Sequence, residues 1–126
     1  MNGFVAVFLG GGLGAAARHG VNLLAAQFIT ARFPWGTLAV NVLGSLLIGV
    51  LAEWFALRTQ LPAPLRLFLV TGVLGGFTTF SAFSLEVGLL IERGQIAAAA
   101  GYVLASVVCA VGAMFLGMYL VRHFAA

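Results

Sequence analysis

Four long stretches of this chain contain almost no charged side chains, and this pattern restricts the fold more than any other feature. Each stretch holds at most two charged residues; the stretches cover about residues 4–28, 37–57, 65–91 and 95–121. A helix needs about 20 mainly apolar residues to cross the hydrocarbon core of a bilayer. We therefore expect residues 1–126 to form a single all-α integral membrane domain with four transmembrane helices.

The composition excludes a soluble domain. Charged residues make up 7% of the chain, against about 25% in typical soluble domains, and so few polar side chains do not cover the surface of a water-soluble globule. The net charge of +3 comes from dispersed arginines, which argues against nucleic-acid binding. The single cysteine, Cys109, excludes an intrachain disulfide and a cysteine-based metal site.

The arginines are distributed almost evenly between the two ends of the predicted bundle. With four alternating spans, one side holds Arg58, Arg66 and Arg122, and the other side holds Arg18, Arg32 and Arg93. Because the numbers of arginines on the two sides are nearly equal, they give almost no positive-inside signal. A chain of 126 residues also makes a thin bundle, which encloses a polar path poorly by itself. We infer a dimer, with an antiparallel arrangement as one option; the charges alone leave a single orientation equally open.

The third stretch contains a segment that is a poor continuous helix. Gly75 and Gly76 are followed, after one phenylalanine, by the β-branched pair Thr78 and Thr79, and all four residues have low helix propensity. A helix broken at membrane depth is tolerated only if its freed backbone groups find partners. The functional interpretation is an ion site made of unwound backbone, as in transporters with discontinuous helices. The alternative is a simple kink or a close-packed helix crossing.

Aromatic and hydroxyl side chains alternate directly after this segment. Phe77, Phe80 and Phe83 recur at every third position, and Ser81 and Ser84 lie between and after them. The edge of an aromatic ring carries partial positive charge. Rings with their edges exposed can therefore line a path for a small anion, and they bind it weakly enough for it to leave. The alternative is that these rings only pack against other helices.

Three further polar residues lie inside the predicted spans, where polar groups are costly. The amide of Asn41 supplies two N–H donors, which suit an anion that loses water, although an interhelical hydrogen bond explains it as well. Arg18 either extends to the membrane surface or attracts anions to a vestibule. Glu86 is too deep in its span for an ordinary surface charge.

Three motifs resemble the signatures of the CrcB/Fluc family of fluoride channels. They are GGLGAAARH at residues 11–19, GTLAVNVLGS at residues 36–45 and GGFTTFSAFS at residues 75–84. The resemblance extends over essentially the whole chain. It implies a passive fluoride-selective channel, not an enzyme, that lets fluoride leave the bacterial cytoplasm through the inner membrane. It further implies a dual-topology homodimer of two oppositely oriented subunits in membrane lipid, with two pores, a central structural sodium ion and a third helix broken mid-membrane.

The resemblance also implies roles for individual residues. The pore residues that it implies are Asn41 as a hydrogen-bond donor, the phenylalanines Phe80 and Phe83, the fourth-helix tyrosine Tyr102, and Ser81, Ser84 and Glu86 on the polar side of the third helix. Gly75 and Thr78 are expected to offer backbone carbonyls to sodium. Arg18 corresponds to the arginine of the family's first helix.

The chain departs from the family pattern at one position. The family usually has a hydroxyl residue after the Phe-Ser pair, where this chain has Ala82. The missing hydroxyl removes one hydrogen-bond partner from the polar side of the third helix. We expect slower, but not abolished, fluoride passage.

Two other functions are consistent with the length of the chain. A proton-coupled small multidrug exporter also has four helices, but it needs a carboxylate in the middle of its first span. The first stretch here contains no acid, and its one charged residue is Arg18. A purely structural membrane subunit leaves Asn41 and the alternating phenylalanines and serines unexplained.

Overall fold

The computed structural model describes residues 2–29, 33–57 and 61–124. Within these ranges all regular secondary structure is helical, with no strands. Four helical passages are long and apolar enough to cross a membrane, as the sequence predicts. Arg32 and Arg58, which enter the prediction of orientation, lie outside the described residues.

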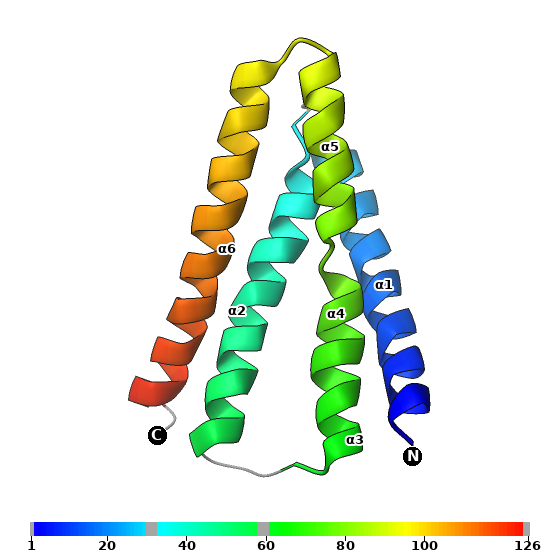
Figure 1. The fold of residues 1–126 in the computed structure, drawn as a ribbon, viewed down its shortest axis with the longest axis vertical. Helices are drawn as coiled ribbons and strands as arrows, with labels where there is room; N and C mark the ends of the chain where they lie inside the picture. Colours follow the sequence, from blue (N-terminus) through cyan, green and yellow to red (C-terminus); the bar gives the residue numbers. More distant parts are fainter. Residues whose placement is uncertain (1, 30–32, 58–60, 125–126) are drawn as a thin grey trace.

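The passages run side by side and form an open bundle (Figure 1). The third passage is built from several consecutive helical segments. In chain order the elements are α1 (Gly3–Phe28), α2 (Trp35–Leu57), α3 (Ala63–Arg66), the π-helix η1 (Leu67–Leu74), α4 (Gly75–Phe77), α5 (Phe80–Glu92) and α6 (Ile96–Phe124). Both chain termini lie at one end of the bundle, and the turn between α5 and α6 lies at the other (Figure 1).

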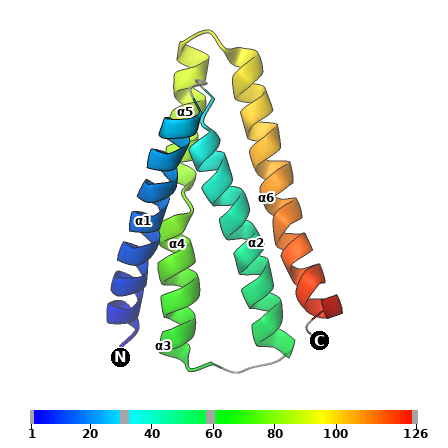
Figure 2. The ribbon, with the colours of Figure 1, turned by 180° about the vertical axis from the view of Figure 1, so that it is seen from behind.

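Glycines allow two pairs of passages to approach closely. α1 packs along η1 and α4, as Figure 2 shows from the opposite side. A Cβ atom added at Gly14 of α1 would collide with the carbonyl oxygen of Val73. α2 packs along α6, and a Cβ atom at Gly49 would collide with the carbonyl oxygen of Met114. Small residues at such contacts are typical of membrane helices.

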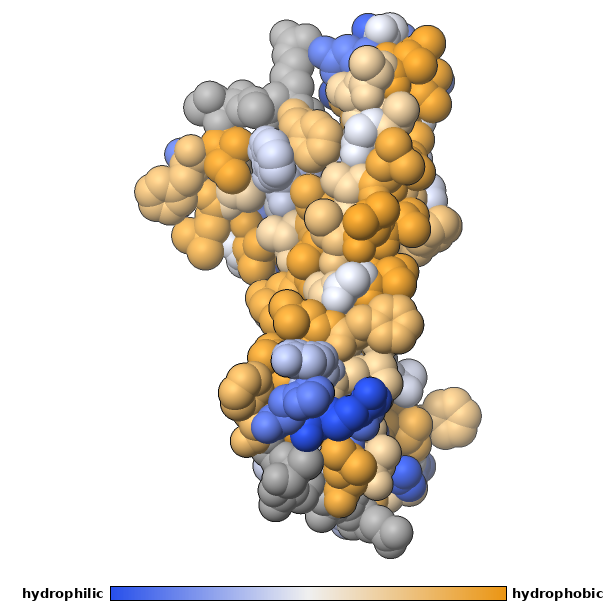
Figure 3. All heavy atoms as spheres, turned by 90° about the vertical axis from the view of Figure 1, so that its left-hand side faces the viewer, coloured by the Kyte–Doolittle hydropathy of each residue, from blue (hydrophilic) through white to orange (hydrophobic). Residues whose placement is uncertain are grey.

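Most large apolar side chains lie on the outside of the molecule. Phe4 and Phe8 are 90% and 80% exposed, whereas Val40 and Tyr102 are completely buried. One face of the molecule is covered mainly by hydrophobic residues, with hydrophilic residues gathered toward its two ends (Figure 3). Such a surface is stable in lipid and would aggregate in water. The chain is a multi-pass membrane protein.

Two residues between α4 and α5 are not helical. Thr78 has φ −91° and ψ 159°, and Thr79 has φ −154° and ψ 120°. These extended conformations interrupt the third passage at the threonine pair that the sequence marks as a poor helix former. We refer to Thr78 and Thr79 as the interruption. That the interruption lies near the middle of the membrane stays a prediction.

Candidate ion pathway

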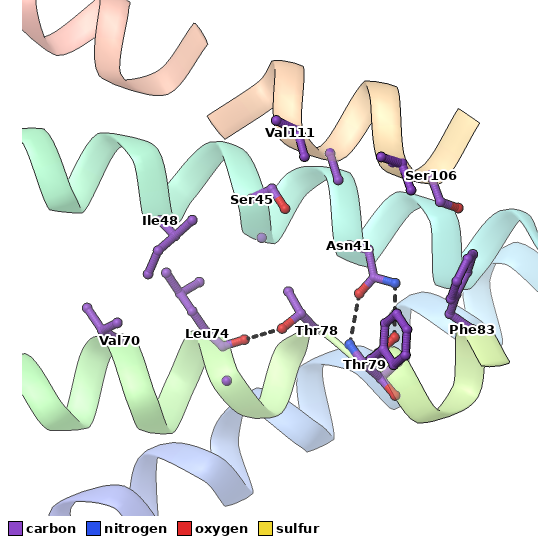
Figure 4. Close-up of a pocket in the computed structure, with 15 residues that line it drawn as sticks. Asn41, Ser45, Ile48, Val70, Leu74, Thr78, Thr79, Phe83, Ser106 and Val111 are labelled. Carbon is purple, nitrogen blue, oxygen red and sulfur yellow. Dashed lines mark hydrogen bonds between the residues drawn. The ribbon is translucent and has the colours of Figure 1, made fainter. Parts of the chain in front are cut away.

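Asn41 of α2 binds both backbone groups of Thr79. Its Nδ2 donates to the Thr79 carbonyl oxygen at 3.0 Å, and its Oδ1 accepts from the Thr79 N–H at 2.8 Å (Figure 4). The two bonds replace helical partners that Thr79 lacks in its extended conformation. Asn41 thus fixes the interruption to α2. The second N–H of its amide group is still a donor for a water or an ion.

The threonine side chains complete the hydrogen bonding of the interruption. Thr79 Oγ1 accepts from the Ala82 N–H at 3.1 Å and so caps the start of α5, the usual role of threonine at this position. Thr78 Oγ1 donates to the carbonyl oxygen of Leu74 at 3.0 Å (Figure 4). The polar groups near the break are therefore paired largely within the chain itself.

Two carbonyl oxygens lose their helical donors at the same place. In a continuous helix the N–H groups of Thr79 and Ala82 would donate to the carbonyls of Gly75 and Thr78. Here those N–H groups donate to Asn41 and to the Thr79 hydroxyl instead. Gly75 and Thr78 both border the larger cavity described below. Carbonyl oxygens freed in this way suit a hard cation, so the residues present fit the predicted sodium ion.

Arg18 of α1 contacts the same region from the other side. Its Nε donates to the carbonyl oxygen of Gly76 at 3.0 Å, next to the end of α4. A cation near a helix C-terminus is favourable because the last carbonyls carry partial negative charge. Arg18 thus links α1 to the interruption, and its predicted role in attracting anions stays a prediction.

A cavity of about 430 Å³ lies between α2, the third passage and α6 (Figure 4). Its wall is mainly apolar and contains five of the predicted site residues: Asn41, Gly75, Thr78, Phe80 and Phe83. The polar groups of this wall include Ser45, Thr79 and Ser106. A mainly apolar cavity with a few placed polar groups is typical of ligand sites. We call it the large cavity.

Ser81 and Ser84 do not line the large cavity. Both residues are exposed in this single chain. The Ser81 hydroxyl lies 3.2 Å from the Thr79 hydroxyl, and the Ser84 hydroxyl donates to the carbonyl oxygen of Phe80 at 3.0 Å. Their predicted place on a polar track therefore stays a prediction.

Two hydroxyl groups of α6 are buried and have no hydrogen-bond partner among the described residues. They belong to Tyr102 and Ser106, which are four residues apart and so lie on one face of the helix. A buried hydroxyl without a partner costs about 1–3 kcal/mol, so both groups are available to water or an ion. The sequence interpretation missed Ser106; its spacing of four from Tyr102 is the signal that points to it.

Glu86 lies at a second, smaller cavity of about 160 Å³. There it accepts a hydrogen bond from the Thr37 hydroxyl at 2.6 Å. Asn22 and the residues that precede and begin α2, among them Phe33 and Trp35, complete the wall. We call it the small cavity. Glu86 does not line the large cavity, and its predicted role in the pore stays a prediction.

Comparison with known proteins finds one matching family profile and relatives that share one name. The family profile described as CrcB-like protein, Camphor Resistance (CrcB) matches residues 5–118. A protein of Granulibacter bethesdensis named fluoride-specific ion channel FluC is 56% identical over 122 residues, which are 97% of this chain and 96% of the relative. Fluoride-specific ion channel FluC 2 of Nitrobacter hamburgensis is 52% identical over 120 residues, 95% of this chain and 97% of the relative. A FluC of Methylobacterium sp. is 54% identical over 118 residues, 94% of each chain.

Proposed function

Because the chain belongs to the CrcB family, we propose that it is a passive channel that conducts fluoride across a membrane and lowers fluoride in a bacterial cytoplasm. The observation that carries this proposal is the identity of more than half over nearly full length with relatives named fluoride-specific ion channels. The family is one of channels, so the chain is not an enzyme, and the exporter and structural-subunit alternatives no longer apply.

The large cavity supports a pathway made of neutral groups. Fluoride is small and strongly hydrated, so a selective path has to replace its water by N–H and O–H donors. The free N–H of Asn41 and the hydroxyl of Ser106 supply such donors, and Phe80 and Phe83 supply ring edges. These groups attract an anion weakly enough for it to leave again. Tyr102 does not line the large cavity, but its ring lies beside that of Phe83, with ring centroids 5.1 Å apart.

We further propose a homodimer of two oppositely oriented subunits with two pores. Phe80 borders the large cavity and is nevertheless 78% exposed in a single chain. A pore-lining ring needs protein around it, and a second copy of the chain would supply that cover. The near-even distribution of arginines supports opposite orientations, because it gives neither one an advantage. The bacterial inner membrane is the proposed location.

Sodium is proposed as a central structural ion. The carbonyl oxygens of Gly75 and Thr78 would hold it, because both have lost their helical donors. When bound, the ion would supply a positive charge that balances the partial negative charge of these carbonyl oxygens. Asn41, Thr79 and Arg18 keep the backbone of the interruption in place around that position.

The direct test is fluoride release from proteoliposomes, followed with a fluoride-selective electrode. We expect fast fluoride efflux and far slower chloride efflux; equal rates for the two anions contradict a fluoride-selective channel. Phe80→Ile tests the path, and Phe8→Ile is its matched control because the two rings are 78% and 80% exposed. We expect the first variant to lose flux as an intact dimer and the second to keep it.

A further inference from the structure

A row of five aromatic rings joins the large cavity to the small cavity. Ring centroids lie 5.5 Å apart for Phe80 and Phe83, 5.1 Å for Phe83 and Tyr102, 5.3 Å for Tyr102 and Phe33, and 4.6 Å for Phe33 and Trp35. Phe80 and Phe83 line the large cavity, and Phe33 and Trp35 line the small one. Tyr102 contacts a ring from each side. The row therefore spans the barrier between the two cavities.

Phe33 holds the least expected place in this row. It precedes α2 outside any helix, yet it is half-buried and packs on the cluster of Leu90, Ala99 and Tyr102. Its ring and that of Tyr102 are inclined by 79°, so that one ring presents its edge to the other. No feature of the sequence marks Phe33, because its contact with Tyr102 joins residues that lie far apart along the chain.

The rings of Tyr102 and Phe33 lie between the residues of the row that line the two cavities, so an anion that moved from one cavity to the other along the row would pass them. The small cavity contains the carboxylate of Glu86, which accepts a hydrogen bond from the Thr37 hydroxyl. That carboxylate repels an anion, so a weakly attractive group is needed at the approach to it. An aromatic ring edge is such a group, and it leaves the ion free to move on.

We propose that Phe33 is a further pathway residue, whose ring lines the passage between the large and small cavities and sets the rate of fluoride transfer. The proposal rests on the proposed function, since it assumes that the chain conducts fluoride. It extends the pathway beyond the helices, to a side chain of the segment between α1 and α2.

The test compares three variants with the unchanged protein in the same proteoliposome assay. Phe33→Leu removes the ring and keeps an apolar side chain, whereas Phe33→Tyr keeps the ring. Phe28→Leu is the matched control, because Phe28 is a 79% exposed ring near the end of α1. We expect Phe33→Leu to lower fluoride efflux about tenfold, equivalent to about 1.4 kcal/mol. Phe28→Leu should keep the original rate, and Phe33→Tyr, which retains the ring, should lose less flux than Phe33→Leu.

A second measurement separates a pathway role from a structural one. The thermal unfolding midpoint in detergent should stay above the assay temperature for Phe33→Leu, although the lost ring contacts lower it relative to Phe28→Leu. Unreduced flux through Phe33→Leu overturns the proposal. The proposal is also overturned if Phe33→Leu and Phe33→Tyr both lose flux and both have a lowered thermal midpoint. If Phe33→Leu does not assemble, Phe33→Met replaces it, and unreduced flux through Phe33→Met is equally decisive. Equal chloride and fluoride efflux in the unchanged protein contradicts the proposed function itself, whatever the variants do.

Discussion

Asn41 shows how one side chain determines the local backbone. Its amide group both donates to and accepts from Thr79, and each such bond contributes about 1 kcal/mol net. The sequence leaves two roles open for Asn41, a hydrogen-bond donor to an anion and a partner in an interhelical hydrogen bond. The structure shows a bond from α2 to the backbone of the interruption, and the remaining N–H keeps the donor role open.

We predict different losses for two substitutions at Asn41. Asn41→Ala leaves the N–H and the carbonyl of Thr79 without partners, at about 1–3 kcal/mol for each buried group. Asn41→Asp still accepts from the Thr79 N–H but loses the donor and adds a negative charge beside the path. We expect Asn41→Ala to lower both the thermal midpoint and fluoride flux. Asn41→Asp should lower fluoride flux strongly and lower the thermal midpoint less than Asn41→Ala does. Wild-type flux in both variants contradicts a role in conduction.

Ala82 offers a second test at the scale of one residue. Its N–H donates to the Thr79 hydroxyl, and a side-chain change leaves that backbone bond in place. Ala82→Thr restores the hydroxyl usual in the family, so we expect faster fluoride efflux than from the unchanged chain. Ala82→Val is the control, because it has the same shape without the hydroxyl. Equal efflux from all three proteins shows that the missing hydroxyl does not limit the rate.

The predicted site separates into two parts for a physical reason. Spacing along a helix places Phe80, Phe83 and Ser84 relative to one another, but it does not show which cavity a side chain reaches. Glu86 lies on the same helix as Phe83 and yet borders the small cavity. Ser106 reaches the large cavity, and Phe33 reaches Tyr102, only through tertiary packing. The hydrogen-bond and sodium roles of the predicted residues stay predictions.

Among the elements, the third passage was the one whose irregularity could be predicted. Two glycines and two threonines near its middle favour a break, and the interruption lies at Thr78 and Thr79. The π-helix before it could not be predicted, because residue pattern does not specify a hydrogen-bond register. Glycine spacing indicated close packing of α1 and of the third passage, but it did not indicate that these two pack together.

This packing gives a test at the scale of the element. Gly14→Ala places a methyl group against the backbone of Val73, whereas Gly12→Ala, on the same helix, meets nothing within 4 Å. We expect Gly14→Ala to destabilise the protein by about 1–3 kcal/mol through overpacking. Gly12→Ala should be neutral or stabilising by up to about 1 kcal/mol, because alanine is the better helix former. Equal unfolding midpoints for the two variants would argue against the packing of α1 on η1.

For the whole molecule, the number and bounds of the passages follow from hydrophobicity and length, because lipid requires long apolar helices. The positive charge near the chain termini is lower than the count of arginines indicates. Arg122 pairs with Glu53, with Nε and Oε1 3.0 Å apart, so one arginine near the chain termini is partly neutralised. The proposed opposite orientations rest on the near-even distribution of the arginines and stay a prediction.

Site-specific labelling tests this arrangement. In a Cys109→Ser background, Gln95→Cys places a single thiol at the turn between α5 and α6, away from the termini. An impermeant thiol reagent applied to sealed inner-membrane vesicles should label part of the protein. Permeabilising the vesicles should reveal a similar remainder. Labelling that is complete from one side only contradicts dual topology.

The hydrogen bonds at the interruption do not require a second copy of the chain. Asn41 and the Thr79 hydroxyl bind backbone groups at the break, and Arg18 binds the neighbouring carbonyl of Gly76, all within one chain. We therefore expect a single subunit to hold this backbone conformation before it meets another copy. In the proposed homodimer, assembly would then be the docking of two preformed surfaces, with a smaller entropic cost than folding on association.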